Sequence, residues 1–124
     1  MSYEWDNKKA TAQMLGRFQP FHEGHYALFE EIIKKTGQVC IEVRDVEGVD
    51  DNPFNFEAVK KNIEERLNPK YKNRFKVILV PNITNISYGR GVGYKIEEIV
   101  LPEKIQQISA TKIRAKMRKE GKIK

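Results

Sequence analysis

This chain of 124 residues has one cysteine, one tryptophan and two histidines, and it has no long apolar run. A single cysteine excludes an internal disulfide and a metal site built from several thiolates. Cys40 lies in an alternating apolar stretch, where burial would raise the pKa of its thiol and disfavour a nucleophilic role. No stretch approaches the roughly 18 apolar residues of a membrane span, and the first residues, MSYEWDNKK, lack the apolar stretch of a signal peptide. We therefore expect a cytoplasmic protein with no membrane partner.

The excess of positive charge is confined to the C-terminal end. The formal net charge is +6, and residues 112–124 carry seven basic residues against one acidic residue, whereas residues 1–111 have sixteen of each sign. A protein that binds long nucleic acid usually spreads its basic residues over a face. The charge distribution therefore argues against nucleic acid as the partner, although binding through the basic C-terminal helix stays an alternative.

Strand and helix patterns alternate along the chain, which predicts a parallel sheet with crossover helices. Apolar stretches predict strands at residues 11–15, 38–44 and 75–80, and the last, rich in apolar residues, is expected to be central. Helical spacing of apolar residues predicts a helix over 24–35 and a second from Asn55, its cap, to about 67.

The remaining elements complete the predicted domain. Residues 94–101 alternate weakly and fit a short edge strand or a helical turn, and a last helix is expected from Ser109 to about residue 119. We therefore predict an α/β fold, a Rossmann-like open parallel sheet of about five strands with helices on both faces. A chain of this length forms one domain, which we place at residues 11–124, after a loose N-terminal segment at residues 1–10.

Two histidines lie where the first predicted strand passes into the first predicted helix. Residues 16–25 read GRFQPFHEGH, with His22 and His25 on either side of Gly24. A helix N-terminus has unpaired N–H groups and a partial positive charge, so it binds phosphate well. Gly24 lacks a Cβ and can let the backbone approach an anion closely. The alternative is that both histidines only cap and line a loop.

A second candidate phosphate site lies near the C-terminus. Residues 108–114 read ISATKIR, in which Ser109 is a good N-cap and Lys112 stands where a capping box has Glu or Gln. The first helical turn is therefore positive and free of a competing carboxylate, which suits a phosphate group. Taken alone, the same residues also fit an ordinary capped helix with Ile113 and Met117 in the core.

The run GRFQPFHEGH followed by ISATKIR resembles the paired signatures of the nucleotidyltransferase superfamily, which includes cytidylyltransferases, and its form is closest to the nicotinamide mononucleotide adenylyltransferases. The resemblance implies transfer of a nucleoside monophosphate from ATP or CTP, used with Mg²⁺, to a phosphate-bearing small-molecule acceptor, with release of pyrophosphate. It implies that His22 and His25 are catalytic. It also implies a set of nucleotide- and phosphate-binding residues, namely Gly16, Arg17, Phe18, Gly24, Ser109, Thr111, Lys112 and Arg114.

Other residues are weaker candidates for an acceptor or base site. Arg44 and Asp45 end the second predicted strand and face the same edge as the histidines, although a salt-bridged strand end explains them as well. Tyr88 and Arg90 lie in YGRGVGY, which fits either a loop closing over a base or acceptor phosphate, or a flexible surface loop. The two aspartates at 50 and 51 belong first of all to a turn, so no protein ligand is assigned to a metal.

Three further possibilities concern function and assembly. A nucleotide-binding regulatory module would keep the pocket and lack turnover, so a test for pyrophosphate release separates it from an enzyme. Nucleic-acid binding through the basic C-terminal helix would weaken steeply as salt rises. A homo-oligomer is compatible with the sequence.

Overall fold

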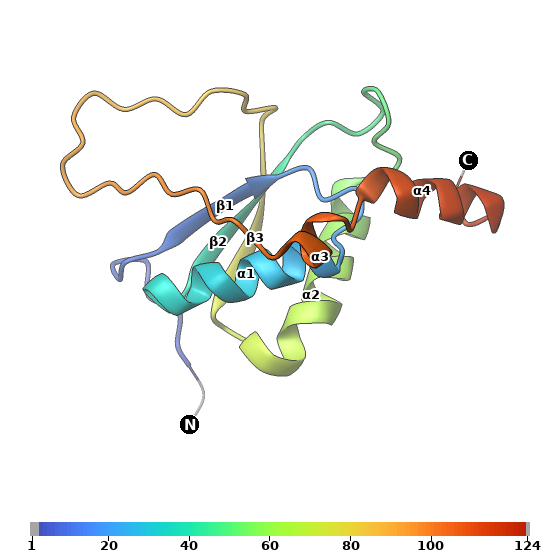
Figure 1. Cartoon of the computed structure of the whole chain (residues 1–124). Coiled ribbons are helices and arrows are strands. Elements are labelled where there is room, and N and C mark those ends of the chain that lie inside the picture. Colours follow the sequence, from blue (N-terminus) through green and yellow to red (C-terminus); the bar gives the residue numbers. More distant parts are fainter. Residues whose placement is uncertain (1–2, 124) are drawn as a thin grey trace.

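The computed structural model describes residues 3–123, which form a small parallel sheet, four helices and one long loop (Figure 1). The sheet has the order β1-β2-β3, with both strand pairs parallel. The α/β class and the parallel sheet expected from the alternating patterns are therefore confirmed. Along the chain the elements are β1 (Ala12–Gly16), α1 (Glu23–Thr36), β2 (Val39–Arg44), α2 (Phe56–Tyr71), β3 (Phe75–Val80), α3 (Glu103–Gln106) and α4 (Ala110–Lys119).

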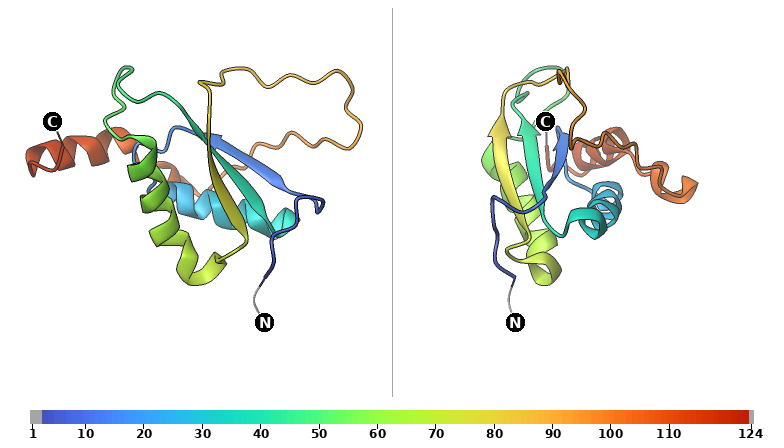
Figure 2. Two further views of the ribbon diagram at one scale, coloured as in Figure 1. Left: turned by 180° about the vertical axis from the view of Figure 1, so that it is seen from behind. Right: turned by 90° about the vertical axis from the view of Figure 1, so that its left-hand side faces the viewer.

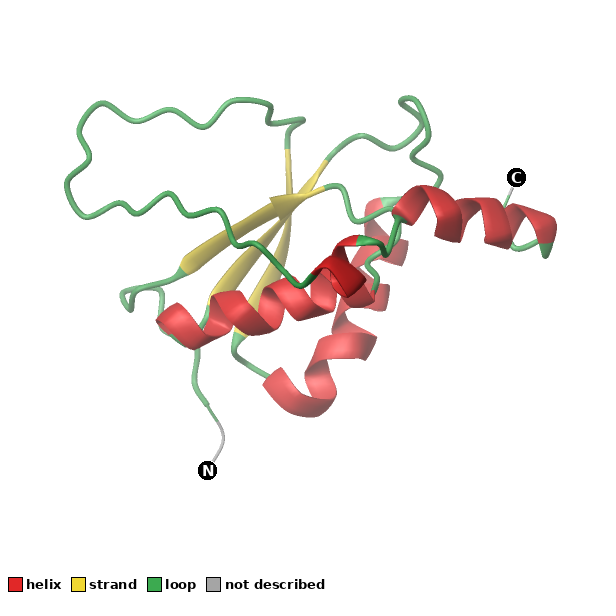
Figure 3. Ribbon diagram, in the orientation of Figure 1, coloured by secondary structure: helices red, strands yellow, loops and turns green. Residues whose placement is uncertain are grey.

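The sheet differs from the prediction in the number of strands and in the identity of the central strand. Residues 3–123 contain three strands instead of about five, because residues 81–102 form a long loop (Figure 3). β3 lies at an edge, where Ile78 is 40% exposed, and β2 lies between the other two strands (Figure 2). Apolar content could not reveal this order, because a strand's position depends on how the crossovers bring distant segments together.

Residues 94–101, expected to form an edge strand or a helical turn, form neither. Tyr94, Ile96 and Val100 are 68%, 64% and 74% exposed. Glu97 in the same stretch pairs with Lys35 of α1, with 2.8 Å between Oε2 and Nζ. The stretch is therefore attached to α1, and no ladder hydrogen bonds join it to a strand of the described sheet.

Helices α1 and α2 pack side by side on one face of the sheet. Lys70 Nζ in α2 lies 3.0 Å from Glu30 Oε2 in α1, and the ring centroids of Phe29 and Tyr71 are 5.1 Å apart. Helices on opposite faces of a sheet cannot touch. Within the described part of the chain, the expectation of helices on both faces is therefore wrong for α1 and α2.

The core lies between these two helices and the sheet. The apolar stripes expected from helical spacing are confirmed, since their residues are buried against the alternating residues of β2. Each such fully buried side chain contributes about 1.5–3 kcal/mol relative to an exposed one. The main contributors are Phe29, Ile32 and Ile33 of α1, Val59, Ile63 and Leu67 of α2, and Val39, Ile41 and Val43 of β2.

The N-terminal segment contacts the amino end of β2. Tyr3 Oη donates to Oε1 of the buried Gln38 at 2.9 Å, and Gln38 Nε2 donates to the Asp6 carbonyl at 2.7 Å. Lys76 Nζ lies 5.3 Å from the ring of Trp5. Residues 1 and 2 of the segment expected to be loose, and residue 124 of the expected domain, lie outside the described residues. The division at residue 10 stays a prediction.

The helix caps expected from the sequence are confirmed. Asn55 Oδ1 accepts from Ala58 N at 2.9 Å at the start of α2, and Ser109 Oγ accepts from Lys112 N at 3.4 Å at the start of α4. Both helices begin near the carboxyl ends of the strands, where α1 also begins (Figure 1). None of the helices in residues 3–123 has the length and apolar character needed to cross a membrane.

Candidate nucleotide site

The loop between β1 and α1 folds around the buried ring of Phe18. Phe18 has a φ of +53°, and a Cβ on Gly16 would lie 2.9 Å from Phe18 Cζ. Gly16 therefore leaves the room that this ring needs. The Phe18 ring lies edge-on to the ring of His25, with 5.0 Å between centroids. Arg17, in the same loop, is exposed and makes no hydrogen bond or ion pair with the described residues.

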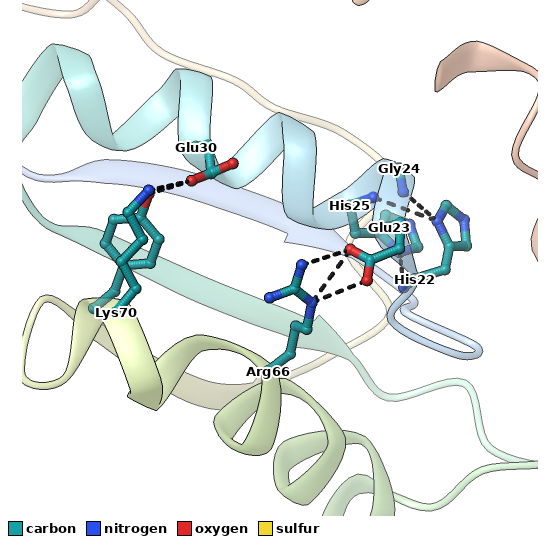
Figure 4. A network of polar contacts seen from close by, with 8 residues as sticks. His22, Glu23, Gly24, His25, Glu30, Arg66 and Lys70 are labelled. Carbon is teal, nitrogen blue, oxygen red and sulfur yellow. Dashed lines mark hydrogen bonds and ion pairs between the residues drawn. The ribbon is translucent and has the colours of Figure 1, made fainter. Parts of the chain in front are cut away.

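The two histidines cap α1 reciprocally (Figure 4). His22 Nδ1 accepts from the backbone N–H of Gly24 at 3.0 Å and of His25 at 3.4 Å. His25 Nδ1 accepts from the backbone N–H of His22 at 3.1 Å. The arrangement is a capping box in which imidazoles replace the usual hydroxyl and carboxylate groups. Both histidines thus do cap the helix, but they use only one ring nitrogen each to do so.

The capping bonds decide which ring nitrogen carries the proton. A neutral imidazole has one N–H donor and one acceptor nitrogen, and Nδ1 is the acceptor in both residues. From this hydrogen-bond network we assign the proton to Nε2 in each ring. Neither Nε2 has a hydrogen-bond partner among residues 3–123. The site therefore offers two imidazole N–H donors that the protein itself does not use.

Burial keeps both imidazoles neutral. Desolvation, with a smaller effect from the neighbouring His22, lowers the pKa of His25 to about 3. Desolvation also lowers the pKa of His22, against the opposing effect of the Glu23 carboxylate. The two rings stack with 3.9 Å between centroids, and Phe21 stacks on His25 at 5.5 Å. At neutral pH the two donors are therefore uncharged and held in place by packing.

The structure gives a reason for glycine at position 24 that differs from the expected close approach of an anion. A Cβ at this position would lie 2.7 Å from His22 Cε1 and 3.0 Å from His22 Nδ1. Any side chain would push the imidazole out of its capping position. The close approach that Gly24 permits is thus made by the His22 ring.

Glu23, the remaining residue of the HEGH run, is paired with a residue that the sequence analysis missed. Arg66 in α2 donates from Nη2 to Glu23 Oε2 at 2.9 Å and from Nε to both carboxylate oxygens at 3.1 and 3.2 Å (Figure 4). An unpaired carboxylate in the first turn would repel a phosphate, and this pairing reduces the repulsion. No local signal could have identified Arg66, because only the packing of α2 on α1 brings it to Glu23.

The second motif lies beside the first. Helix α3 packs against α1, and the carbonyl oxygen of Ile105 lies 3.7 Å from where a Gly24 Cβ would be. The chain then enters α4, and the first turns of α1 and α4 lie next to each other (Figure 1). Two segments that are far apart in the sequence therefore meet at the carboxyl edge of the sheet.

The first turn of α4 is positive and contains no acidic residue. Lys112 is exposed, and its Nζ has no hydrogen bond or ion pair with the described residues. Thr111 is also exposed, and its Oγ1 accepts from Arg114 Nη2 at a long 3.4 Å. The first N–H groups of a helix lack intrahelical partners, so this turn presents donors next to those of α1.

Arg114, which the resemblance assigns to the phosphates, is buried with only 4% of its surface exposed. Its Nε donates to Asp51 Oδ2 at 2.9 Å and its Nη1 donates to the Gln19 carbonyl at 2.6 Å. The residues around Asp51 have the composition of a turn, and nothing in the local sequence indicates this contact. Hydrogen bonds from Arg118 and then Arg114 lower the pKa of Asp51, so the carboxylate stays ionised.

Among the described residues, none of the weaker candidates has a hydrogen bond or ion pair with either motif. Arg44 Nη2 donates to Asn82 Oδ1 at 2.7 Å, while Arg44 Nε is buried without a partner. Asp45 is exposed and makes no ion pair with Arg44. Tyr88 is 54% exposed, and it lies with Arg90 in the long loop, whose far bend is at the opposite end of the molecule from α4 (Figure 1). The loop thus does not cover the histidines in this conformation.

Residues 3–123 contain no group of three or more His, Cys, Asp or Glu side chains arranged to hold a metal ion. Mg²⁺ usually keeps several waters and is bound through substrate phosphates with one or two carboxylates, without a dedicated all-protein cage.

In a comparison with known families, the segment that contains the first motif matches a family model. Residues 14–67 match the model of the family described as cytidylyltransferase-like, and this segment includes both histidines but ends before residues 108–114. No curated protein matches the chain significantly. The family match supports no assignment to the nicotinamide mononucleotide adenylyltransferases in particular. Residues 14–67, less than half of the chain, are thus similar to the cytidylyltransferase-like family.

Proposed function

We propose that this protein is a nucleotidyltransferase that moves a nucleoside monophosphate from ATP or CTP to a phosphate-bearing small molecule and releases pyrophosphate. The proposal rests on the two neutral imidazoles at the start of α1, whose Nδ1 atoms accept backbone hydrogen bonds and whose Nε2–H groups are uncommitted. The first turn of α4 lies beside them and supplies further donors. The cytidylyltransferase-like match of residues 14–67 supports the same class of reaction.

In the proposed reaction, an oxygen of the acceptor's phosphate attacks the α-phosphorus of the triphosphate. A new P–O bond forms while the bond to the oxygen bridging the α- and β-phosphates breaks, and pyrophosphate leaves with that electron pair. Negative charge on the phosphoryl oxygens must be stabilised in the transition state. The Nε2–H groups of His22 and His25 and the N-terminus of α1 are suited to stabilise it, since fixed donors act most strongly where charge develops.

The leaving group would be held by the first turn of α4. Backbone N–H groups after Ser109 and the exposed side chain of Lys112 can bind the β- and γ-phosphates, and the unpaired guanidinium of Arg17 adds a further cation. When bound with the triphosphate, Mg²⁺ supplies additional charge neutralisation at the phosphate oxygens. The reaction needs no side-chain nucleophile, because positioning and charge neutralisation carry most of the catalysis.

The acceptor would bind at the carboxyl ends of β2 and β3. Arg44 has a buried Nε without a partner, and its Nη2 is oriented by Asn82. An anionic group of the acceptor would satisfy this donor. Asp45 is exposed next to Arg44 and would favour an acceptor that also carries a hydrogen-bond donor. A direct role of Tyr88 and Arg90 would require the long loop to move toward the histidines.

The four common nucleoside triphosphates test this function. Each is added with Mg²⁺ in a thermal-shift assay, and the best one is then combined with phosphate-bearing acceptors while pyrophosphate is measured. We expect ATP or CTP to raise the melting temperature, and we expect pyrophosphate only when an acceptor is present. Triphosphate binding without pyrophosphate release with any acceptor would favour the regulatory module. Salt-sensitive binding to nucleic acid, without triphosphate binding, would instead favour a role for the basic helix.

A further inference from the structure

Asp51 lies in the loop between β2 and α2, outside both motifs, yet it contacts the second one. Its Oδ2 accepts from Arg114 Nε at 2.9 Å, and its Oδ1 accepts from Arg118. Arg118 is exposed at the surface, whereas the side chain of Arg114 is only 5% exposed. A buried guanidinium is costly without a counterion, so Asp51 is what makes the buried position of Arg114 tolerable.

The guanidinium of Arg114 joins three separate segments. Nη1 donates to the carbonyl of Gln19 in the histidine loop at 2.6 Å, and Nη2 reaches Thr111 Oγ1 in the first turn of α4 at 3.4 Å. The Gln19 side chain in turn bonds both backbone groups of Phe54, with Nε2 to the carbonyl at 2.9 Å and Oε1 to the N–H at 2.8 Å. The histidine loop, the 45–55 loop and α4 are therefore tied together at one point.

The contacts of Arg114 fix how the two halves of the proposed phosphate site, the first turns of α1 and α4, are placed relative to each other. Gln19 lies just before His22 in the same loop, and Arg114 lies one helical turn after Thr111. Each of the three guanidinium nitrogens donates one hydrogen bond within the protein. Two of the five N–H groups remain, but the side chain is only 5% exposed, so a phosphate has little access to them. Arg114 is thus better placed to hold the two helix starts together than to bind the triphosphate.

We propose that Asp51 is a positioning residue for nucleotidyl transfer, acting through Arg114 to hold the first turn of α4 against the loop that carries His22 and His25. The inference rests on the nucleotidyltransferase function proposed above and deepens it. Asp51 touches neither substrate nor the reacting phosphorus. Its effect is geometric, since small misplacements of a phosphate-binding group can cost about a hundredfold in rate.

The alternative role of Arg114 makes the opposite prediction for Asp51. If Arg114 were a direct phosphate ligand, Asp51 would compete with the triphosphate for the guanidinium. Removing the carboxylate would then strengthen triphosphate binding. In the positioning role, removing it weakens binding and slows turnover. The sign of the change therefore separates the two roles.

The variant Asp51→Asn removes the charge and keeps one acceptor oxygen. Asp50→Asn is the matched control, because Asp50 is adjacent and has no hydrogen bond or ion pair with the described residues, and Asn tolerates its φ of +52°. Binding of inorganic tripolyphosphate and of ATP is measured by calorimetry, and kcat is measured by pyrophosphate release. Circular dichroism and the melting temperature show that each variant is folded under the assay conditions.

We expect Asp51→Asn to raise the Kd for tripolyphosphate about tenfold, as for the loss of one charge-assisted hydrogen bond, and to lower kcat about tenfold to a hundredfold. Asp51→Glu should restore part of kcat, and Asp50→Asn should behave as the wild type. Arg114→Lys keeps the charge but loses the forked contacts, so it should resemble Asp51→Asn. The double variant should be no worse than Arg114→Lys, because the two residues act through one contact.

Four outcomes would overturn the inference. Tighter tripolyphosphate binding by folded Asp51→Asn would make Arg114 a direct ligand. An active wild type with equal kcat in Asp51→Asn and Asp50→Asn would remove any role of Asp51. If Asp51→Asn does not fold, wild-type kcat in folded Arg114→Lys would overturn the inference instead. A wild-type protein that neither binds tripolyphosphate nor releases pyrophosphate would overturn the proposed function, and the role of Asp51 with it.

Discussion

His22 has two separable tasks, and replacing it by Asn or by Ala distinguishes them. Its Nδ1 caps α1 by accepting from the backbone N–H groups of Gly24 and His25 at 3.0 and 3.4 Å. Its Nε2–H is the donor that we propose acts on the α-phosphate. Asn offers an oxygen close to the position of Nδ1 and nothing in place of Nε2–H, whereas Ala offers neither.

The two tasks differ in the size of their expected effects. Asn is among the best N-caps, and replacing a good cap by Ala costs about 1 kcal/mol, or about 4 °C in the melting temperature of a domain of this size. His22→Ala should therefore be less stable than the wild type by this amount, and His22→Asn should be close to it. Both variants should lose about a hundred- to a thousandfold in kcat, as when one preorganised donor is removed.

The assay combines unfolding, binding and turnover. Thermal unfolding gives stability, calorimetry gives the Kd for the best triphosphate, and pyrophosphate release gives kcat. The Kd should change less than kcat, because the donors act mainly on charge that develops in the transition state. Wild-type kcat in folded His22→Asn would refute the donor role and leave His22 as a cap only. Equal melting temperatures for His22→Ala and His22→Asn would contradict the capping argument.

Three further results are expected. Desolvation lowers the pKa of His25 to about 3, so below pH 6.5 the unfolded chain binds a proton that the folded chain does not. The free energy of unfolding, measured with urea, should therefore be up to about 2 kcal/mol lower at pH 5 than at pH 7. His25→Asn should reduce this loss. Gly24→Ala should stay folded but lose most pyrophosphate release, because a Cβ would lie 2.7 Å from His22 Cε1; wild-type kcat would contradict this. Deleting residues 121–124 should leave the calorimetric Kd for triphosphate nearly unchanged, while Lys112→Ala weakens binding; equal losses would point to a diffuse polyanion site.

Local sequence patterns predicted the parts of the fold that depend on neighbouring residues. The stripe through Ile63 and Leu67 of α2, the alternation of Ile41 and Val43 in β2 and the cap at Asn55 were all expected, and the structure has them. Each of these features depends on side-chain periodicity or on hydrogen bonds within one turn. The edge position of β3 and the lack of a strand or helical turn at residues 94–101 were not expected. They depend on which distant segments cover which face of the sheet.

The candidate site divides in the same way. The position of His22 and His25 at a helix start follows from the local sequence, and so does the Ser109 cap. The pairing of Glu23 with Arg66 and of Asp51 with Arg114 could not be read from the sequence, because each partner comes from another element. Asp51 in particular has an ordinary turn composition around it, and only its contact with Arg114 distinguishes it.

The amino-acid sequence by itself determined the α/β pattern, the two helix starts rich in donors and the residues that cap them. Only the tertiary structure decided that burial holds His25 neutral and that the guanidinium of Arg114 is turned inward. The physical reason is the range of the interactions. Helix caps and periodic burial act over a few residues, whereas desolvation and ion pairing depend on segments that meet only when the chain has folded.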